Sequence, residues 1–325
     1  MSQIIQDIQP ILACLAQGGI AAIPTETVYG LAGNASDTQA IQQIYALKQR
    51  PLDHPLIMHI SKDDDIRRYA IEIPDYVYPL IQEFWPGPLT IVLQCDLKQI
   101  NPLVTAGQNT IALRCPQHPL AQRLLQNLPF PLVAPSANPF GKVSPTSAQH
   151  VQQSFPDADL LILDGGRCPV GIESTIVLAT NPKGYRILRH GHIDSAQLSA
   201  TLPNHALIAE AKDTPRVSGN LLTHYQPTKP LYYFTEVEHA VAFCKQHLDT
   251  YVISSHPLSL FQTNQGIMLP EEPNLWAYEL YEQLRLADHS MAKNILITLP
   301  PEEPAWQGTR ERILKAGTSL ARKIG

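Results

Sequence analysis

The chain has 325 residues, of which 44% are apolar and only 16% are charged, and it carries 29 prolines and a formal net charge of -5. A chain of this length and apolar content can bury one large core or two unequal ones. The sequence has no low-complexity run, so it does not indicate disorder. Its acidic balance also argues against a strong non-specific nucleic-acid binder, because such proteins are usually basic overall.

The sequence indicates a reducing compartment and no membrane segment. The N-terminal residues 1–7 lack the basic start and apolar core of a signal peptide. No apolar run approaches the roughly 20 residues that span a bilayer. The five cysteines form no CxxC pair, so we expect buried free thiols in a cytoplasmic protein. They are Cys14, Cys95, Cys115, Cys168 and Cys244.

The first part of the chain mixes helical and strand patterns. Apolar residues at helical spacing predict helices over 8–15, 37–47 and about 120–125, and Ser144 followed by Pro145 predicts a further helix start. Several neighbouring strands lack a helix between them, so the sheet is expected to be mixed. Short apolar runs predict these strands: 20–23, 56–60, 89–95, 110–115, 132–134, 160–163, 175–178 and 185–188.

The pattern weakens after residue 191. A helix is predicted over 194–202, and the polar, turn-rich stretch 213–230 reads as a linker. A second alternation then predicts strands over 231–234, 251–254, 267–269 and 295–299, and helices over 237–247, 275–286 and 309–322. We therefore expect three parts: an α/β domain over 1–200, a linker over 201–230 and a smaller α/β domain over 231–325.

Polar segments that follow strands are the candidate ligand contacts, because open α/β sheets bind ligands beyond the C-terminal ends of their strands. The segment 24–31 offers hydroxyl and backbone N–H groups, or forms an ordinary turn with local Ser/Thr bonds. Lys48 and Arg50 suit a polyphosphate, or balance the dipole at a helix C-terminus. His59 is either structural or a partner for a carboxylate.

Further candidates stand at other strand ends. Ser136 and Asn138 let a ligand approach the backbone, or belong to a proline-bounded turn. Ser144 provides an anion site at a helix N-terminus, or simply caps the helix. Arg114 pairs with a substrate carboxylate or with a neighbouring acid. Three more polar residues lie at strand ends: Thr110, Ser174 and Arg189.

Familiar single-loop motifs are absent from the sequence. It contains no GxxxxGK[ST] loop, no GxGxxG, no HExxH, no GxSxG elbow and no protein-kinase signature set. A nucleotide site in this chain must therefore be assembled from dispersed strand ends.

Taken together and in this order, these segments resemble the threonylcarbamoyl-AMP synthase family in its long form, with a YrdC-like domain and an appended C-terminal domain. The resemblance runs from residue 20 to about 191. Residues 218–219 and 224–227 resemble the linker signature of the family, although Gly219-Asn220-Leu221 and Gln226 differ from it. The strongest parts are the segments 24–31, 48–51 with 54–57, 85–90, 135–138 and 173–176.

The resemblance implies a fold and an activity. The fold is a twisted, mixed YrdC-like sheet with flanking helices, plus a smaller Rossmann-like α/β domain. The activity is that of a nucleotidyltransferase: L-threonine, bicarbonate or CO2 and ATP give threonylcarbamoyl-AMP and pyrophosphate. The product feeds the t6A modification of adenosine 37 in tRNAs that read ANN codons, carried out by downstream threonylcarbamoyl-transfer proteins.

The resemblance also implies the ligands and their contacts. Mg2+ accompanies ATP, with no protein metal site and no permanently bound cofactor, and contact with RNA is weak. Lys48 and Arg50 are expected at the ATP phosphates and at the transition-state charge. The residues expected to hold threonine, with Arg114 at its α-carboxylate, are Thr25, His59, Arg114 and Ser174. The further residues expected at the nucleotide are Thr110, Ser136, Asn138, Ser144, Arg189 and, closing from the linker, Tyr225.

Two other functions stay open at the level of sequence. A non-catalytic module could bind RNA through Lys48 and Arg50, although no RNP-type aromatic motif is present. A carbamoyltransferase related to hydrogenase maturation factors would carry zinc-binding cysteine clusters and an acylphosphatase-like segment, and neither is visible here.

Overall fold

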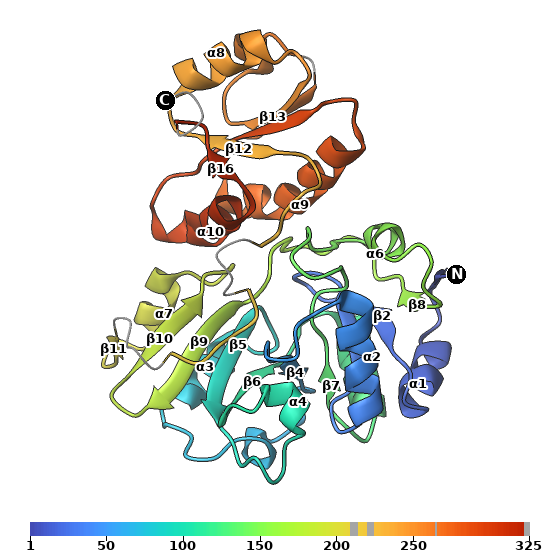
Figure 1. Ribbon diagram of the computed structural model, residues 1–325. Helices are drawn as coiled ribbons and strands as arrows, with labels where there is room; N and C mark the ends of the chain where they lie inside the picture. Colours follow the sequence, from blue (N-terminus) through green and yellow to red (C-terminus); the bar gives the residue numbers. More distant parts are fainter. Residues whose placement is uncertain (209–213, 220–223, 264, 322–325) are drawn as a thin grey trace.

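The computed structural model describes residues 1–208, 214–219, 224–263 and 265–321, and two separate sheets divide it into two α/β parts (Figure 1). The first part holds the larger sheet. Its strands are β1 (Gln3–Ile5), β2 (Ala21–Ile23), β3 (Gly30–Asn34), β4 (Ile57–His59), β5 (Leu89–Gln94), β6 (Thr110–Arg114), β7 (Leu132–Val133), β8 (Leu161–Leu163), β9 (Thr175–Asn181), β10 (Gly184–Arg189) and β11 (Ala206–Leu207).

This sheet is mixed, as the sequence predicts. Its order is β1-β8-β2-β3-β7-β4-β6-β5-β9-β10-β11. The pairs β2–β3, β5–β6 and β9–β10 are antiparallel, whereas β4–β6 and β5–β9 are parallel. Strand β11 extends the sheet into the range expected for the linker, because Ala206 and Leu207 pair with β10.

Helices cover the larger sheet, and their starts follow local capping rules. Asp37, for example, accepts hydrogen bonds from the backbone N–H groups of Gln39 and Ala40 and so begins α2. Asp194 and Gln197 form a reciprocal capping box at α7. The helices are α1 (Ile8–Ala16), α2 (Thr38–Lys48), α3 (Val77–Phe84), α4 (Pro102–Thr105), α5 (Pro119–Asn127), α6 (Ala148–Ser154) and α7 (Ser195–Thr201), with a 3-10 turn η1 at Ile66–Arg68.

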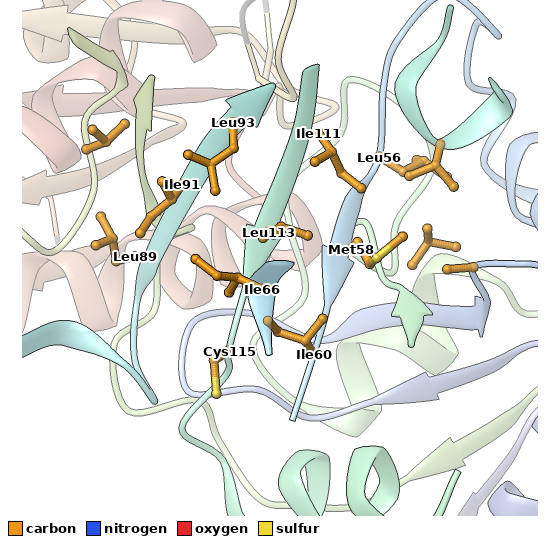
Figure 2. Packing of buried hydrophobic residues seen from close by; sticks show 14 of the residues in the cluster. Leu56, Met58, Ile60, Ile66, Leu89, Ile91, Leu93, Ile111, Leu113 and Cys115 are labelled. Carbon is orange, nitrogen blue, oxygen red and sulfur yellow. The ribbon is translucent and has the colours of Figure 1, made fainter. Parts of the chain in front are cut away.

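The largest core lies on one face of the central strands. Leu89, Ile91 and Leu93 alternate along β5, and Figure 2 shows them on the same side as Ile111 and Leu113 of β6. This alternation follows from the two-residue period of a strand. The parallel pairing of β4 with β6 places His59 beside Arg114 at one edge of the sheet.

The second part holds a five-stranded parallel sheet in the order β14-β13-β15-β12-β16. Its strands are β12 (Leu231–Phe234), β13 (Thr250–Ser254), β14 (Gly266–Met268), β15 (Asn294–Thr298) and β16 (Thr318–Ser319). Its helices are α8 (Val237–Gln246), α9 (Pro273–His289) and α10 (Gln307–Ala316), with 3-10 turns η2 (Leu258–Phe261) and η3 (Pro304–Trp306). The expected smaller α/β unit is therefore confirmed.

Two expected helix boundaries are wrong. No helix begins at Ser144: α6 starts at Ala148, because the Ser147 side chain caps it by accepting from the His150 N–H, while the Ser144 hydroxyl donates to Glu173. The helix expected over 309–322 ends at Ala316, because extended Gly317 leads into β16, which pairs with β12. Its expected last residue, Arg322, lies outside the described residues.

The described cysteines are free thiols, with Cys14 half-buried and the other four buried, as expected. Among the described residues, none of the helices is both long and apolar enough to cross a membrane.

The two parts meet through α9 and α10, which face the larger sheet (Figure 1). A Cβ added at Gly308 of α10 would lie 2.6 Å from the Gly191 carbonyl oxygen and 2.9 Å from Ile172 Cδ1. A Cβ at Gly171 would meet the Ala277 carbonyl oxygen of α9 at 2.4 Å. The absence of a Cβ atom at Gly308 and Gly171 therefore allows the two parts to approach closely.

Replacing Gly308 by alanine tests this contact. Alanine favours an isolated helix by about 1 kcal/mol over glycine, yet here the new methyl group meets the backbone of Gly191. We expect Gly308→Ala to lower the free energy of unfolding by roughly 1–3 kcal/mol, the usual cost of overpacking. Urea unfolding measures the change, with Leu314→Ala on the exposed side of α10 as the control. An increase in stability for Gly308→Ala would contradict the close approach.

Candidate active site

A small cavity lies where the ends of β4, β6 and β10 meet the segment that follows β7. The C-terminus of α2 and the linker complete its walls. Eight of the residues predicted from the sequence line it, so the structure gathers most of the candidate site in one place. They are Lys48, Arg50, His59, Arg114, Ser136, Asn138, Arg189 and Tyr225.

Lys48, the last residue of α2, points into the segment that follows β7. Its ammonium group donates to the carbonyl oxygens of Ser136 and Asn138, at 2.6 Å in the latter case. Burial, and then the nearby Arg50 guanidinium, hold the pKa of Lys48 well below its usual range. Gln49 adopts a left-handed conformation at the helix C-cap, which turns the chain so that Lys48 and Arg50 face one cavity.

Arg50 and Arg189 reach the linker from opposite sides. Arg50 Nη2 donates to the Ser218 hydroxyl at 3.1 Å, and Arg189 Nη1 donates to the Ser218 carbonyl oxygen at 3.1 Å. Arg50 also lies 5.4 Å from the ring centroid of Phe140. Burial is the main reason that the pKa of Arg50 falls to about 10. The linker therefore touches both cations beside the cavity.

Arg114 pairs with a neighbouring acid, one of the two alternatives that the sequence leaves open. Its Nη2 lies 2.7 Å from Glu26 Oε1, and both side chains are buried. The other Glu26 oxygen accepts from the Gln117 backbone N–H at 3.0 Å. Arg114 Nε keeps no partner, so this guanidinium retains a free donor at the cavity.

His59 presents an acceptor rather than a donor. Its Nδ1 lies 3.2 Å from the Ile57 carbonyl oxygen, which can only accept, so Nδ1 carries the proton. Burial, and then Arg114, lower the pKa of His59 to about 3. The partnerless Nε2 therefore suits an O–H or N–H group of a ligand. The possible bond from His59 to a carboxylate, which would need a donor on the ring, stays a prediction.

Unsatisfied polar atoms gather at this cavity. Buried polar groups are almost always hydrogen-bonded, so each buried polar atom without a partner indicates a position where a ligand can bond. Within the described part of the chain, five of the eight buried side-chain nitrogen and oxygen atoms without a partner belong to residues that line the cavity. They are His59 Nε2, Arg114 Nε, Asn138 Oδ1, His224 Nδ1 and Tyr225 OH.

Four predicted residues lie outside the cavity lining. The Thr25 hydroxyl donates to the Val28 carbonyl oxygen at 2.6 Å, which is the local turn bond that the sequence left as an alternative. Thr110 lines an adjoining hollow that shares Ile57 and Ser218 with the cavity. Ser144 bonds Glu173, and it neither caps a helix nor offers a helix N-terminus to an anion.

Ser174 supports the cavity from behind. Its hydroxyl lies 2.7 Å from the Thr90 hydroxyl and accepts from Arg189 Nη2 at 3.0 Å. The Ser174 carbonyl oxygen accepts from Arg189 Nε at 3.0 Å. Ser174 thus fixes the direction of the Arg189 side chain.

Sequence reasoning missed four lining side chains: Phe140, Glu173, Ser218 and His224. Glu173 and His224 lie in the segments 173–176 and 224–227, whose residues Ser174 and Tyr225 were predicted to bind ligands, but neither Glu173 nor His224 was predicted to do so. Burial is the main reason that the pKa of His224 falls to about 3; nearby Glu173 opposes this shift, whereas Lys48 and the neighbouring arginines add to it. Its contact with the Phe140 ring, centroid to centroid 5.9 Å, has no signature in the sequence.

The described residues offer no metal cage. Within those ranges, no group of three or more His, Cys, Asp or Glu side chains is placed to hold a metal ion. Both oxygens of Glu173 already accept hydrogen bonds from Ser144, Tyr281 and Arg312.

Comparison with known proteins matches nearly the whole chain. The Sua5/YciO/YrdC family model, described as "Telomere recombination", matches residues 13–191. A second model, "Threonylcarbamoyl-AMP synthase, C-terminal domain", matches residues 193–318. The crystal structure of Pyrococcus abyssi Sua5 complexed with L-threonine has a TM-score of 0.87 and 29% identity, and the alignment covers 98% of this chain and 99% of that one.

Curated relatives are named threonylcarbamoyl-AMP synthase, like the second family model. A threonylcarbamoyl-AMP synthase of Bacillus subtilis is 40% identical over 222 residues, which are 67% of this chain and 64% of the relative. The threonylcarbamoyl-AMP synthase of Pyrococcus abyssi is 38% identical over 218 residues, which are 66% of this chain and 64% of the relative. The matched region thus spans slightly less than two thirds of these relatives.

The linker contact beside the cavity can be tested with two glycines. Gly219 and Gly141 both have positive φ, at 84° and 81°, and both line the cavity. A Cβ at Gly219 would lie 2.5 Å from the Tyr225 hydroxyl, whereas a Cβ at Gly141 meets nothing within 4 Å. We therefore expect Gly219→Ala to displace the linker and Gly141→Ala to cause backbone strain alone.

Tryptic cleavage after Arg216 in the linker measures the displacement. Cleavage should be several times faster in Gly219→Ala than in Gly141→Ala at equal thermal stability. Equal cleavage rates in the two variants would show that the contact with Tyr225 does not hold the linker.

Proposed function

Because this chain belongs to the Sua5/YciO/YrdC family and carries the threonylcarbamoyl-AMP synthase C-terminal domain, we propose that it is an L-threonylcarbamoyladenylate synthase. It condenses L-threonine, bicarbonate or CO2 and ATP into threonylcarbamoyl-AMP and releases pyrophosphate. Mg2+ enters with ATP. The product is the activated donor for t6A modification of tRNA, passed to downstream threonylcarbamoyl-transfer proteins in the cytoplasm.

The observation that carries this proposal is an excess of buried positive charge. Four of the described lining residues are lysine or arginine, and they are between 1% and 8% exposed: Lys48, Arg50, Arg114 and Arg189. Among the described lining residues, Glu173 is the only carboxylate. Burying charge without compensation is costly, so such a cavity favours an anionic ligand. A triphosphate supplies the negative charge that balances these cations.

The two ends of the cavity suit different parts of the substrates. Lys48 and Arg50, beside the linker, face the phosphates, where they stabilise charge that develops on the transferred group. Arg189 and Asn138 complete the phosphate side. His59 and Arg114 offer one acceptor and one donor side by side, which matches the hydroxyl or amine and the carboxylate of an amino acid.

The reaction needs positioning more than a protein nucleophile. The threonine amine attacks the carbon of CO2, or of bicarbonate with loss of hydroxide, and forms a carbamate after losing a proton. A carbamate oxygen then bonds to the α-phosphorus of ATP, and the bond to the pyrophosphate oxygen breaks. Lys48 and Arg50 hold the phosphates for this displacement. Neutral His59 orients the amino acid without adding another positive charge.

The linker limits access of water to this chemistry. Tyr225 is 1% exposed and lines the cavity, and its φ of 62° turns the chain over the site. Carbamates and acyl phosphates break down in water, so a cover protects both intermediates. Residues 220–223 of the linker lie outside the described residues.

The RNA-binding alternative fits this geometry less well. Lys48 and Arg50 are buried and face a closed cavity, so they do not form a surface that an RNA backbone could follow. A single-stranded nucleic acid needs an open basic groove with accessible aromatic rings.

Pyrophosphate release tests the proposed activity. With ATP and Mg2+ present, release should depend on both threonine and bicarbonate, and omission of either should abolish it. Lys48→Ala or Arg50→Ala should reduce the rate by roughly 100-fold or more, the scale for loss of one oriented charge stabiliser. Unfolding midpoints report whether each variant keeps the fold, and exposed Lys293→Ala serves as the control. Strong RNA binding without any such release would contradict the proposal.

A further inference from the structure

Arg312 of α10 reaches from the second part of the molecule to the wall of the cavity. Its side chain is fully buried. Nε donates to Glu173 Oε2 at 3.0 Å, and Nη2 donates to the Glu173 carbonyl oxygen at 3.3 Å. Nη1 donates to the carbonyl oxygen of His190, the residue that follows β10. One guanidinium thus joins α10 to two segments of the larger sheet.

Glu173 receives a second donor from the same side. The Tyr281 hydroxyl of α9 donates to Glu173 Oε2 at 2.9 Å. Ser144 donates to the other oxygen, Oε1, at 2.5 Å. The carboxylate that lines the cavity is therefore directed mainly by side chains from the second part of the chain.

The linker is held by the same helices. Arg312 Cζ lies 5.3 Å from the ring centroid of Tyr225, and the Tyr281 and Tyr225 rings stack with centroids 5.9 Å apart. Lys315 Nζ donates to the Gly219 carbonyl oxygen at 2.7 Å. Both described ends of the linker beside the cavity, 214–219 and 224–230, thus contact α10 or α9.

We infer that Arg312 is a positioning residue of the cavity: it keeps the Glu173 carboxylate turned away from Lys48 and Arg189, so that these cations stay available to an anionic ligand. The inference rests on the proposed function for the identity of that ligand, a nucleoside triphosphate. It assigns the second part of the chain a direct role in completing the site.

The charges around Glu173 explain why such a residue is needed. Burial raises the pKa of Glu173, but Arg312, Arg189 and Ser144 together lower it to about 2, so the group is ionised at neutral pH. An ionised carboxylate without Arg312 would pair with the next cations, which face it from the cavity. The titratable and charged groups around Glu173 are Arg312, Tyr281, Arg189, Lys48, His224 and Tyr225.

We therefore expect the loss of Arg312 to cause a defect in ATP binding that depends on pH. Without this guanidinium, the largest of the groups that lower the pKa of Glu173 is lost, so that this pKa rises. Above the new pKa the ionised carboxylate competes with ATP for Lys48 and Arg189; below it the neutral acid does not compete. ATP should then bind less tightly at pH 8 than at pH 6. In the unsubstituted chain Glu173 stays ionised and paired over this whole range, so it adds no such dependence.

Equilibrium binding of ATP with Mg2+ to the full chain, from pH 6 to pH 8, tests the inference. We expect Arg312→Gln to weaken ATP binding about 10-fold at pH 8, and less at pH 6, relative to the unsubstituted chain at the same pH. Glu173→Gln added to Arg312→Gln should restore most of the affinity and remove the extra pH dependence, because it removes the competing charge. Arg310→Gln on the same helix, which pairs with Glu302, should stay within about twofold.

Several outcomes would overturn the inference. These are unchanged ATP affinity in Arg312→Gln, or a loss that is equal at all pH values and is not rescued by Glu173→Gln. Should Arg312→Gln fail to fold, Arg312→Lys provides the test: it keeps the charge but loses the fork, and its weaker ATP binding should again be rescued by Glu173→Gln. Pyrophosphate release by the unsubstituted chain separately decides the proposed function, so the two failures are distinguishable.

Discussion

Four buried cations around one cavity are the constraint on which the rest of this structure depends. Lys48, Arg50, Arg114 and Arg189 come from α2, the turn after it, β6 and β10, and each needs a counter-charge or carbonyl oxygens while no ligand is bound. Glu26 neutralises Arg114, backbone carbonyls hold Lys48, and Ser218 of the linker contacts the other two. These arrangements leave an excess of positive charge around the cavity, where Glu173 is the only carboxylate among the described lining residues.

The fold supplies this cavity by bringing strand ends together, not by a phosphate-binding loop. The mixed order places β4, β6 and β7 side by side, so that polar residues far apart in the sequence meet at one edge. Helices α10 and α9 of the second part then add Arg312 and Tyr281 behind Glu173. The small second part, which has its own core, thus also supports a wall of the site in the first part from behind. The linker lies between them and contacts both.

The sequence predicted most elements and most of the cavity because local patterns determine them. Short apolar runs located β5 and β6, and Asp37 marked the start of α2. The helix start predicted at Ser144 was wrong: a Ser-Pro pair is typical of a helix start, but Ser147 makes the capping hydrogen bond of α6. The end of α10 depended on strand pairing between Thr318 and β12, which is a tertiary contact. Arg312 had no local signature, since its role arises only from burial against a residue 139 positions away.

We propose that these cations form one site for a triphosphate beside an amino acid. A crystal structure of the chain with L-threonine and a non-hydrolysable ATP analogue tests it most directly. We expect phosphate oxygens within hydrogen-bond distance of Lys48 and Arg50, and threonine against His59 and Arg114, with the linker closed over both. Ligand density elsewhere, for example in the hollow between Trp276 and Arg310 of the second part, with the cationic cavity empty, would contradict it.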